Sequence, residues 1–188
     1  MAFSFPDILD GNPLIAAAKN DEGLERALHS DCAAVFLLYG DLCTLPALTE
    51  RIAAAGKAAF VHVDLIDGLA AREVSVDYVR RATRAGGIIS TKPSLIRRAR
   101  ECGLCAVQRF FVIDSMALEN LRRQLEHTRP DVIEILPGVM PKILRRITGF
   151  TRIPVIAGGL ISDKEDILAA LDAGAAAISA TDPQIWFL

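Results

Sequence analysis

Aromatic side chains are scarce in this 188-residue sequence, which has eight Phe, two Tyr and one Trp, together 6% of its residues. Hydrophobic residues nevertheless make up 52% of the chain, so most of its apolar content is Ala, Val, Ile and Leu. This mixture is typical of strands that are buried on both faces, as in a parallel sheet covered by helices. The shortage of rings also leaves few residues for the stacking of a nucleobase, Tyr78 and Phe150 being weak candidates.

Long apolar runs are missing as well. No segment approaches the roughly 18 consecutive apolar residues that a membrane span requires. The first 12 residues lack the basic region followed by an apolar stretch that marks a secretory signal. We therefore expect a cytoplasmic protein without a membrane partner.

Histidine and cysteine are also few, with three and four residues. Cys102 and Cys105 form a C-x-x-C motif, but zinc normally has four ligands and no second pair follows at a suitable spacing. Because Cys102 is expected to end a helix and Cys105 to open a strand, the pair is interpreted as structural. No activated Ser or Cys nucleophile is recognisable either. The sequence predicts no metal, no cofactor and no catalytic residue.

The net charge is only −2, but its distribution is uneven. Residues 1–71 carry a net charge of −6, residues 72–152 a net charge of +8 and residues 153–188 a net charge of −4. A basic middle between acidic ends is a charge asymmetry that can indicate a nucleic-acid surface.

Short apolar runs alternate with amphipathic stretches along the whole chain. Each apolar run has the length of a strand, and most are rich in Val, Ile or Phe. The predicted strands are residues 14–18, 33–39, 58–65, 87–90, 105–112, 132–136, 154–157 and 176–180. The predicted helices are residues 22–29, 46–55, 74–85, 94–102, 116–127, 140–149 and 163–173.

Helix ends carry their own signals. Glycine tolerates the left-handed conformation that ends many helices, and four glycines are predicted in this role, Gly56, Gly86, Gly103 and Gly174. Ser162 followed by Glu165 has the spacing of a capping box at the start of the last full helix.

Alternation of strand and helix predicts parallel βαβ units, and eight strands favour a closed α/β barrel of the (β/α)8 TIM type. Its loops must be short, and its last helix must be truncated because only residues 182–188 follow the eighth strand. We expect one domain over residues 1–188, with residues 1–12 as a short N-terminal extension. An open flavodoxin-like sheet is the alternative fold.

Ligands of such barrels bind at the carboxyl ends of the strands, and here these ends are polar almost every time. Gly158 and Gly159 end the seventh strand, and Ser179 and Thr181 end the eighth. Adjacent glycines let backbone amides approach a phosphate, hydroxyls add donors, and the dipole of the following helix adds attraction. Because loops seven and eight often form a phosphate site, we prefer this interpretation to a tight turn without function.

Other charged residues lie at neighbouring strand ends. His62 and Asp64 share one face of the third strand by the period of two, with Asp64 at the mouth and His62 deeper, as a satisfied core residue. Glu134 falls inside an apolar strand, so its charge requires a partner. Lys92 and Arg109 are the natural partners, for Glu134 or for the anion of a ligand.

Paired arginines recur on four successive predicted helices. If they face outward, they form one cationic surface that suits the phosphates of a nucleic acid. An ordinary solvated surface is the other interpretation, but these segments supply few compensating acids. The candidate residues of this basic belt are Arg80, Arg81, Arg97, Arg98, Arg122, Arg123, Arg145 and Arg146.

Five motifs in order resemble the glycerol-3-phosphate-responsive glycerol uptake operon antiterminator family. They are His-Val-Asp-Leu-Ile-Asp-Gly at 62–68, Gly-Ile-Ile-Ser-Thr-Lys at 87–92, Gln-Arg-Phe-Phe at 108–111, Glu-Ile-Leu-Pro-Gly-Val-Met-Pro-Lys at 134–142 and Ile-Ala-Gly-Gly-Leu-Ile at 156–161, followed by Trp186. The likeness runs from about Leu14 to the C-terminus.

The resemblance implies a barrel that senses glycerol 3-phosphate and binds the leader mRNA of glycerol-catabolic genes, where it prevents transcription termination. It brings no catalytic set with it. Under this interpretation Gly158, Gly159, Ser179 and Thr181 hold the phosphate. The other candidates, Asp64, Lys92 and Glu134, face the glycerol hydroxyls or one another. Arg109 supports them.

Two other functions stay open. One is a barrel enzyme that acts on a small phosphorylated glycerol or triose compound, and the other is a metabolite-binding protein without a nucleic-acid partner. A short barrel that lacks a helix would also leave apolar surface to cover, which suggests a homodimer.

Overall fold

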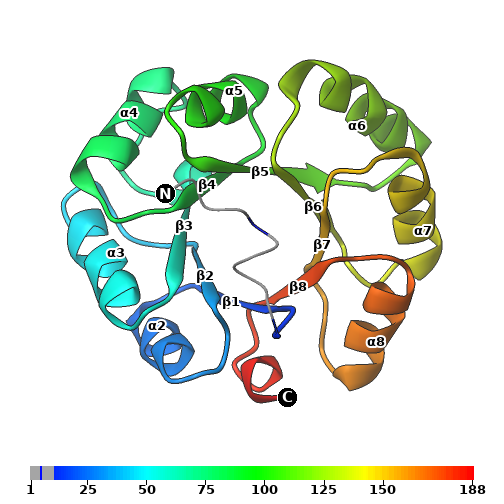
Figure 1. The fold of residues 1–188 in the computed structure, drawn as a ribbon, viewed down its shortest axis with the longest axis horizontal. Helices are drawn as coiled ribbons and strands as arrows, with labels where there is room; N and C mark the ends of the chain where they lie inside the picture. The colour runs from blue at the N-terminus through cyan, green and yellow to red at the C-terminus, as the bar shows by residue number, and fades with distance from the viewer. Residues whose placement is uncertain (1–4, 6–10) are drawn as a thin grey trace.

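The computed structural model describes Phe5 and residues 11–188. Eight parallel strands close into a barrel in chain order, with β1 paired to β8 (Figure 1). The (β/α)8 barrel is therefore confirmed and the open sheet is wrong. The strands are β1 (Leu14–Ala18), β2 (Ala34–Leu37), β3 (Ala58–His62), β4 (Gly87–Ser90), β5 (Cys105–Phe111), β6 (Val132–Leu136), β7 (Val155–Gly158) and β8 (Ala177–Ala180).

Helices form a ring outside the barrel, one after almost every strand (Figure 1). Each turns a narrow apolar stripe toward the strands, as on α5, where Leu95, Ile96 and Ala99 are buried and the arginines are not. The α-helices of the described chain are α2 (Asp21–Leu28), α3 (Leu45–Ala54), α4 (Glu73–Ala82), α5 (Pro93–Glu101), α6 (Ser115–Thr128), α7 (Pro141–Phe150) and α8 (Lys164–Asp172).

The core has two parts because successive strand residues point to opposite faces. Outward residues such as Val35, Val61 and Ile133 pack against the helices. Inward residues fill the barrel, where Phe36 and Phe60 lie with ring centroids 5.6 Å apart. Both faces of each strand are thus buried, which explains the aliphatic composition.

Two local predictions are wrong. Strand β3 stops at His62, and Val63–Leu65 form a 3-10 turn, η1, so the period of two does not extend to Asp64. Helix α4 ends at Ala82 with an extended Thr83, so Gly86 is no helix cap. Gly56, Gly103 and Gly174 do adopt positive φ directly after their helices.

The start of α8 differs from the predicted capping box by one residue. Asp163 is the N-cap, and its side chain accepts a hydrogen bond of 2.9 Å from the amide of Asp166. The Asp166 carboxylate in turn accepts from the amide and the hydroxyl of Ser162. Asp and Ser are about equally good N-caps, so the pattern predicted the kind of cap but placed it one residue early.

The segment after β8 packs back onto the barrel. Ile185–Phe187 form a 3-10 turn, η2, that packs beside β1 (Figure 1). Trp186 is 1% exposed, and its indole N–H donates to the carbonyl of Ala180 at 2.8 Å. The Trp186 ring is therefore part of the packed core outside the strands.

Most of the predicted N-terminal extension lies outside the described residues. Phe5 is buried inside the barrel, with its ring edge-on to Phe60 at 6.0 Å. None of the described helices is sufficiently long and apolar for a membrane span.

Candidate functional site

A buried charge network joins three strands at the carboxyl end of the barrel. Glu134 on β6 is 1% exposed. Its Oε2 accepts a hydrogen bond of 2.6 Å from Nε of Arg109 on the adjacent β5, and its Oε1 accepts one of 2.6 Å from Ser179 on β8. The buried carboxylate thus has the partner that its position required, and that partner is Arg109 rather than Lys92.

The hydrogen bonding of Arg109 uses one of its three side-chain nitrogens. Only its Nε has a hydrogen-bond partner among the described residues, and that partner is Glu134. The side chain is 9% exposed and lines a hollow of about 100 Å³. The planar guanidinium edge suits two oxygens of a phosphate or a carboxylate.

The hollow lies where the sequence predicted convergence. It is small beside the several hundred Å³ of a typical drug-sized pocket, so it suits a compact metabolite. Strands β1, β5, β6 and β8 and the loops after β2, β7 and β8 supply its wall, which consists of Ala17, Leu38, Arg109, Glu134, Leu136, Gly159, Leu160, Ile161, Ser179, Ala180 and Thr181.

The double glycine is required by its surroundings. A Cβ on Gly158, the last residue of β7, would lie 2.4 Å from the Ser179 hydroxyl and 2.7 Å from Oε1 of Glu134. Gly159 has a φ of +75°, and the following Leu160 also has a positive φ, +63°, while its side chain is exposed. Positive φ is costly for leucine, and such strain is often found at ligand-binding loops.

Ser179 and Thr181 have different surroundings. The Ser179 hydroxyl donates to Glu134, so its hydrogen is directed into the network and not into the hollow. Thr181 is exposed at the rim, and its side chain has no hydrogen-bond partner within the described chain. Asp163 caps the N-terminus of α8, and Glu165 and Asp166 follow it, so three carboxylates oppose the attraction that the dipole of α8 was expected to add.

Asp64 and Lys92 form a separate cluster between β3 and β4. Asp64 accepts from the hydroxyl of Ser90, at 3.0 and 3.1 Å, and from the amide and hydroxyl of Thr91, at 2.8 and 3.1 Å. Burial by itself raises the pKa of Asp64, but these hydrogen bonds outweigh it and lower that pKa. Nζ of Lys92 lies 3.6 Å from Oδ1 of Asp64, and neither residue lines the hollow.

His62 is buried as predicted, with 3% exposure, but it is not satisfied. Nδ1 has no hydrogen-bond partner in the part of the chain that the structure describes. Burial and then the nearby Arg109 charge lower the pKa of His62 to about 4, although Asp64 acts in the opposite direction. The imidazole is therefore neutral at neutral pH.

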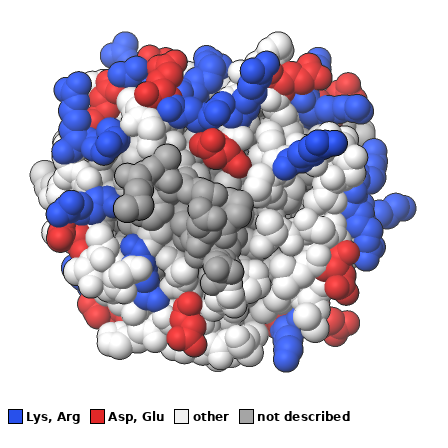
Figure 2. Space-filling model, in the orientation of Figure 1, with Lys and Arg blue, Asp and Glu red and all other residues white. Residues whose placement is uncertain are grey.

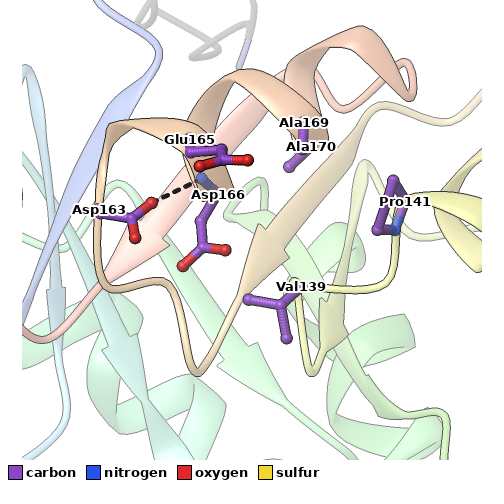
Figure 3. A pocket seen from close by; sticks show the side chains of 8 residues that line it. Val139, Pro141, Asp163, Glu165, Asp166, Ala169 and Ala170 are labelled. Atoms are coloured by element: carbon purple, nitrogen blue, oxygen red, sulfur yellow. Dashed lines mark hydrogen bonds between the residues drawn. The ribbon is translucent and has the colours of Figure 1, made fainter.

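A larger hollow, of about 260 Å³, lies between α8 and the loop from β6 to α7 (Figure 3). Val139 and Pro141 form one side, and the acidic start of α8 forms the other. Three carboxylates, Asp163, Glu165 and Asp166, line it. This acidic lining repels a phosphate, so the hollow is a poor candidate for an anion site despite its size.

Seven of the eight belt arginines are exposed. In Figure 2, blue side chains gather along the margin formed by α4 to α7. Arg98 does not belong to a free surface, because it pairs with Asp77 at 2.7 Å and Glu101 at 3.0 Å. Ion pairs within the described chain involve none of the other seven: Arg80, Arg81, Arg97, Arg122, Arg123, Arg145 and Arg146.

A groove of about 340 Å³ between α6 and α7 interrupts the belt. Arg122 lies over the ring of Phe150 at 5.4 Å, and Arg146 and Glu119 are also in its wall. Of Tyr78 and Phe150, the two candidates for base stacking, Phe150 therefore lies among belt residues. The Tyr78 hydroxyl instead donates to the carbonyl of Leu42 at 2.6 Å.

The two cysteines of the C-x-x-C motif occupy structural positions. Cys102 is the C-cap of α5, and Cys105 is buried in the barrel interior. No cluster of three or more His, Cys, Asp or Glu side chains that could hold a metal occurs in the described part of the chain.

Sequence reasoning missed the residues that hold the site in place. Ser90 and Thr91 were recognised only as a polar strand end, yet they bind Asp64 with a hydroxyl and an amide. Leu38 and Leu160 carry no polar signal, although both line the hollow. The positive φ of Leu160 has no signal in a single sequence.

The sequence is similar to known proteins over nearly its whole length. Residues 14–186 match the family model described as glycerol-3-phosphate responsive antiterminator. The uncharacterized protein YgcP of Escherichia coli (strain K12) is 43% identical over 181 residues, which are 96% of this chain and 95% of YgcP.

Two solved structures are similar over nearly their whole length. A glycerol uptake operon antiterminator regulatory protein from Listeria monocytogenes is 33% identical, with a TM-score of 0.90 and coverage of 94% of this chain and 95% of that one. A glycerol uptake operon antiterminator-related protein from Thermotoga maritima is 34% identical, with a TM-score of 0.82 and coverage of 92% and 96%.

Barrel enzymes with 16% identity, an epimerase and an aldolase among them, share the fold alone. The family model covers nearly the whole chain. The three relatives with 33% to 43% identity also align with nearly the whole chain. The resemblance seen in the sequence is thereby confirmed, and the chain belongs to the glycerol-3-phosphate responsive antiterminator family.

Proposed function

We propose that this chain senses glycerol 3-phosphate in the hollow lined by Arg109. In the bound state it binds the leader mRNA of glycerol-catabolic genes and prevents transcription termination. The observation that carries the proposal is a buried guanidinium whose free edge faces a small hollow, in a chain that belongs to an antiterminator family over residues 14–186.

In this proposal the phosphate binds between the Arg109 guanidinium and the loops after β7 and β8. Gly159 gives the phosphate access to the backbone, and Thr181 adds a hydroxyl at the rim. Glu134 lines the same hollow, and a carboxylate has lone pairs left to accept from a glycerol hydroxyl after its two hydrogen bonds. Ser179 and Gly158 act by holding Glu134 in place. Asp64 and Lys92 belong to the edge of the mouth.

The RNA surface in this proposal is the exposed part of the belt on α4 to α7. Exposed arginines without ion pairs attract phosphates and release counterions, so the affinity falls as salt rises. The groove between α6 and α7 offers Phe150 and Arg122 as a platform for one unpaired base.

Strand β5 connects the two surfaces. Arg109 points into the hollow, and its neighbour Gln108 points outward, where it accepts from Thr128 at 2.7 Å and donates to Gln124 at 2.9 Å, both on α6. Helix α6 carries Arg122 and Arg123. A ligand can favour RNA binding only by stabilising the conformation that binds RNA, and β5 with α6 is a continuous route for that coupling.

A gel shift with leader RNA tests the proposal, with and without glycerol 3-phosphate and at two salt concentrations. We expect tighter binding with the ligand and weaker binding at high salt. Equal RNA affinity with and without the ligand would remove the sensor from consideration.

Charge reversal locates the surface. The variant Arg97→Glu/Arg145→Glu/Arg146→Glu should lose RNA binding. The control Arg26→Glu/Lys164→Glu, on helices α2 and α8, which carry no belt residue, should keep most of it. Full affinity in the belt variant would exclude these three residues as contacts.

An enzyme that acts on a small phosphorylated glycerol or triose compound is the second candidate. The observation in its favour is that His62, Asp64 and Lys92, which have titratable groups, occupy adjacent strand ends near the mouth. Turnover of any glycerophosphate by the purified chain would support it.

A further inference from the structure

His62 is the residue of the barrel interior whose hydrogen bonding is incomplete. Ala58 and Phe60, on the same face of β3, belong to the interior cluster, so His62 also points inward. Of the buried side-chain nitrogen and oxygen atoms of the described residues, Nδ1 of His62 alone has no partner. A buried polar atom without a partner destabilises the fold, so its retention requires an explanation.

His62 does not itself line the hollow, but it lies beside a residue that does. Leu37 pairs with Val61 in the β2–β3 register, which places Leu38 beside His62. Leu38 packs on the interior cluster and lines the hollow. Arg109 also lines the hollow, and its charge lowers the pKa of His62. Strands β7 and β8, which supply the phosphate loops, lie on the other side of the barrel (Figure 1).

The chemistry of the group favours a hydroxyl as its partner. Nδ1 of a neutral imidazole either donates or accepts, depending on the tautomer, and an alcohol hydroxyl does both. A phosphate oxygen only accepts, and Arg109 already offers it a charged donor nearer the hollow. A small polyol phosphate has both groups, with the hydroxyls a few bonds away from the anion.

We propose that Nδ1 of His62 binds a carbon-bound hydroxyl of the ligand whose phosphate lies against Arg109, so that His62 distinguishes polyol phosphates from alkyl phosphates. The inference rests on the proposed function for the presence of a phosphate at Arg109. It adds a residue and a chemical selectivity that the phosphate contacts cannot supply.

The test is a calorimetric binding cycle on the full chain with two ligands, glycerol 3-phosphate and propyl phosphate, which lacks both hydroxyls. Wild type should prefer glycerol 3-phosphate. His62→Leu should weaken the affinity for glycerol 3-phosphate about tenfold, in line with one lost hydrogen bond, and leave the affinity for propyl phosphate unchanged. His62→Asn, whose amide lies close to the position of Nδ1, should retain part of the preference. His127→Leu, on the exposed face of α6, is the matched control.

Stability supplies a second readout. His62→Leu removes an unsatisfied group, so the ligand-free variant should be at least as stable as wild type while binding glycerol 3-phosphate less well. His62→Met gives the same comparison if leucine is not accommodated.

The outcomes separate the two proposals. If wild type binds both ligands and His62→Leu keeps the full preference for glycerol 3-phosphate, His62 is not the selective residue and only this inference fails. If wild type binds neither ligand, the ligand site of the proposed function fails and this inference falls with it.

Discussion

Replacement of Glu134 with leucine should destabilise the barrel because it leaves the Arg109 charge buried without its partner. Glu134 is 1% exposed and Arg109 is 9% exposed, and Nε and Oε2 lie 2.6 Å apart. Removal of one member of a buried ion pair typically costs about 3–5 kcal/mol. Because the terminal nitrogens of Arg109 reach the hollow, we expect the loss near the lower end, about 3 kcal/mol.

The double variant Arg109→Met/Glu134→Leu isolates the cause. It removes both charges and both desolvation costs, so its stability should return to within about 1–2 kcal/mol of wild type. Urea unfolding with linear extrapolation measures both variants, and an unchanged m-value shows that the same surface is exposed. The double variant should still fail to bind glycerol 3-phosphate. That result would show that the pair is kept for the ligand and not for the fold.

Two results would refute this reasoning. The single variant could lose less than about 1 kcal/mol, which would mean that Arg109 turns to solvent without cost. The double variant could be as unstable as the single one, which would mean that packing and not charge is responsible. Ser179→Ala is the milder control, since it removes one hydrogen bond to Glu134 and leaves the ion pair in place.

Three further predictions concern the same end of the barrel. Gly158→Ala should lower the free energy of unfolding by about 1–3 kcal/mol and abolish ligand binding, because the added Cβ would lie 2.4 Å from the Ser179 hydroxyl and 2.7 Å from Glu134. Urea unfolding and calorimetric titration measure the two effects, and a variant that binds the ligand normally would contradict the prediction. The His62 pKa of about 4 lies below the ordinary 6.5, so the unfolded chain takes up a proton first as the pH falls. Stability should therefore decrease between pH 6.5 and 4 by up to about 3 kcal/mol, and urea unfolding of His62→Leu should lack this slope. Asp64 has a lowered pKa, so its contribution is present above its unfolded pKa and is lost as the pH falls below that value. Asp64→Asn should lower the free energy of unfolding at neutral pH by about 1–2 kcal/mol. If wild type and Asp64→Asn are equally stable at pH 7, the hydrogen bonds from Ser90 and Thr91 to the carboxylate contribute nothing.

The sequence by itself determined the barrel and the end of it at which the polar strand ends gather. Eight apolar runs of strand length, separated by amphipathic stretches, admit few arrangements, since buried parallel strands need helices on the outside. All eight strands occur within two residues of their predicted starts, and the N-terminal bounds of β1, β3, β4, β5 and β6 agree. The buried partner of Glu134 was also predictable in kind, because an isolated charge inside a strand must be paired.

Tertiary structure alone decided which polar residues meet. The turn η1 breaks the alternation after His62 and sends Asp64 toward Ser90 and Thr91, away from the hollow, while barrel closure brings Ser179 of β8 to Glu134 of β6. Periodicity describes neighbours along one strand, whereas these contacts cross strands and depend on register, closure and rotamers. Whether a side chain has a partner depends on atoms that come from elsewhere in the chain. For this reason the sequence could not show that Arg98 is paired with Asp77, or that Nδ1 of His62 has no partner among the described residues.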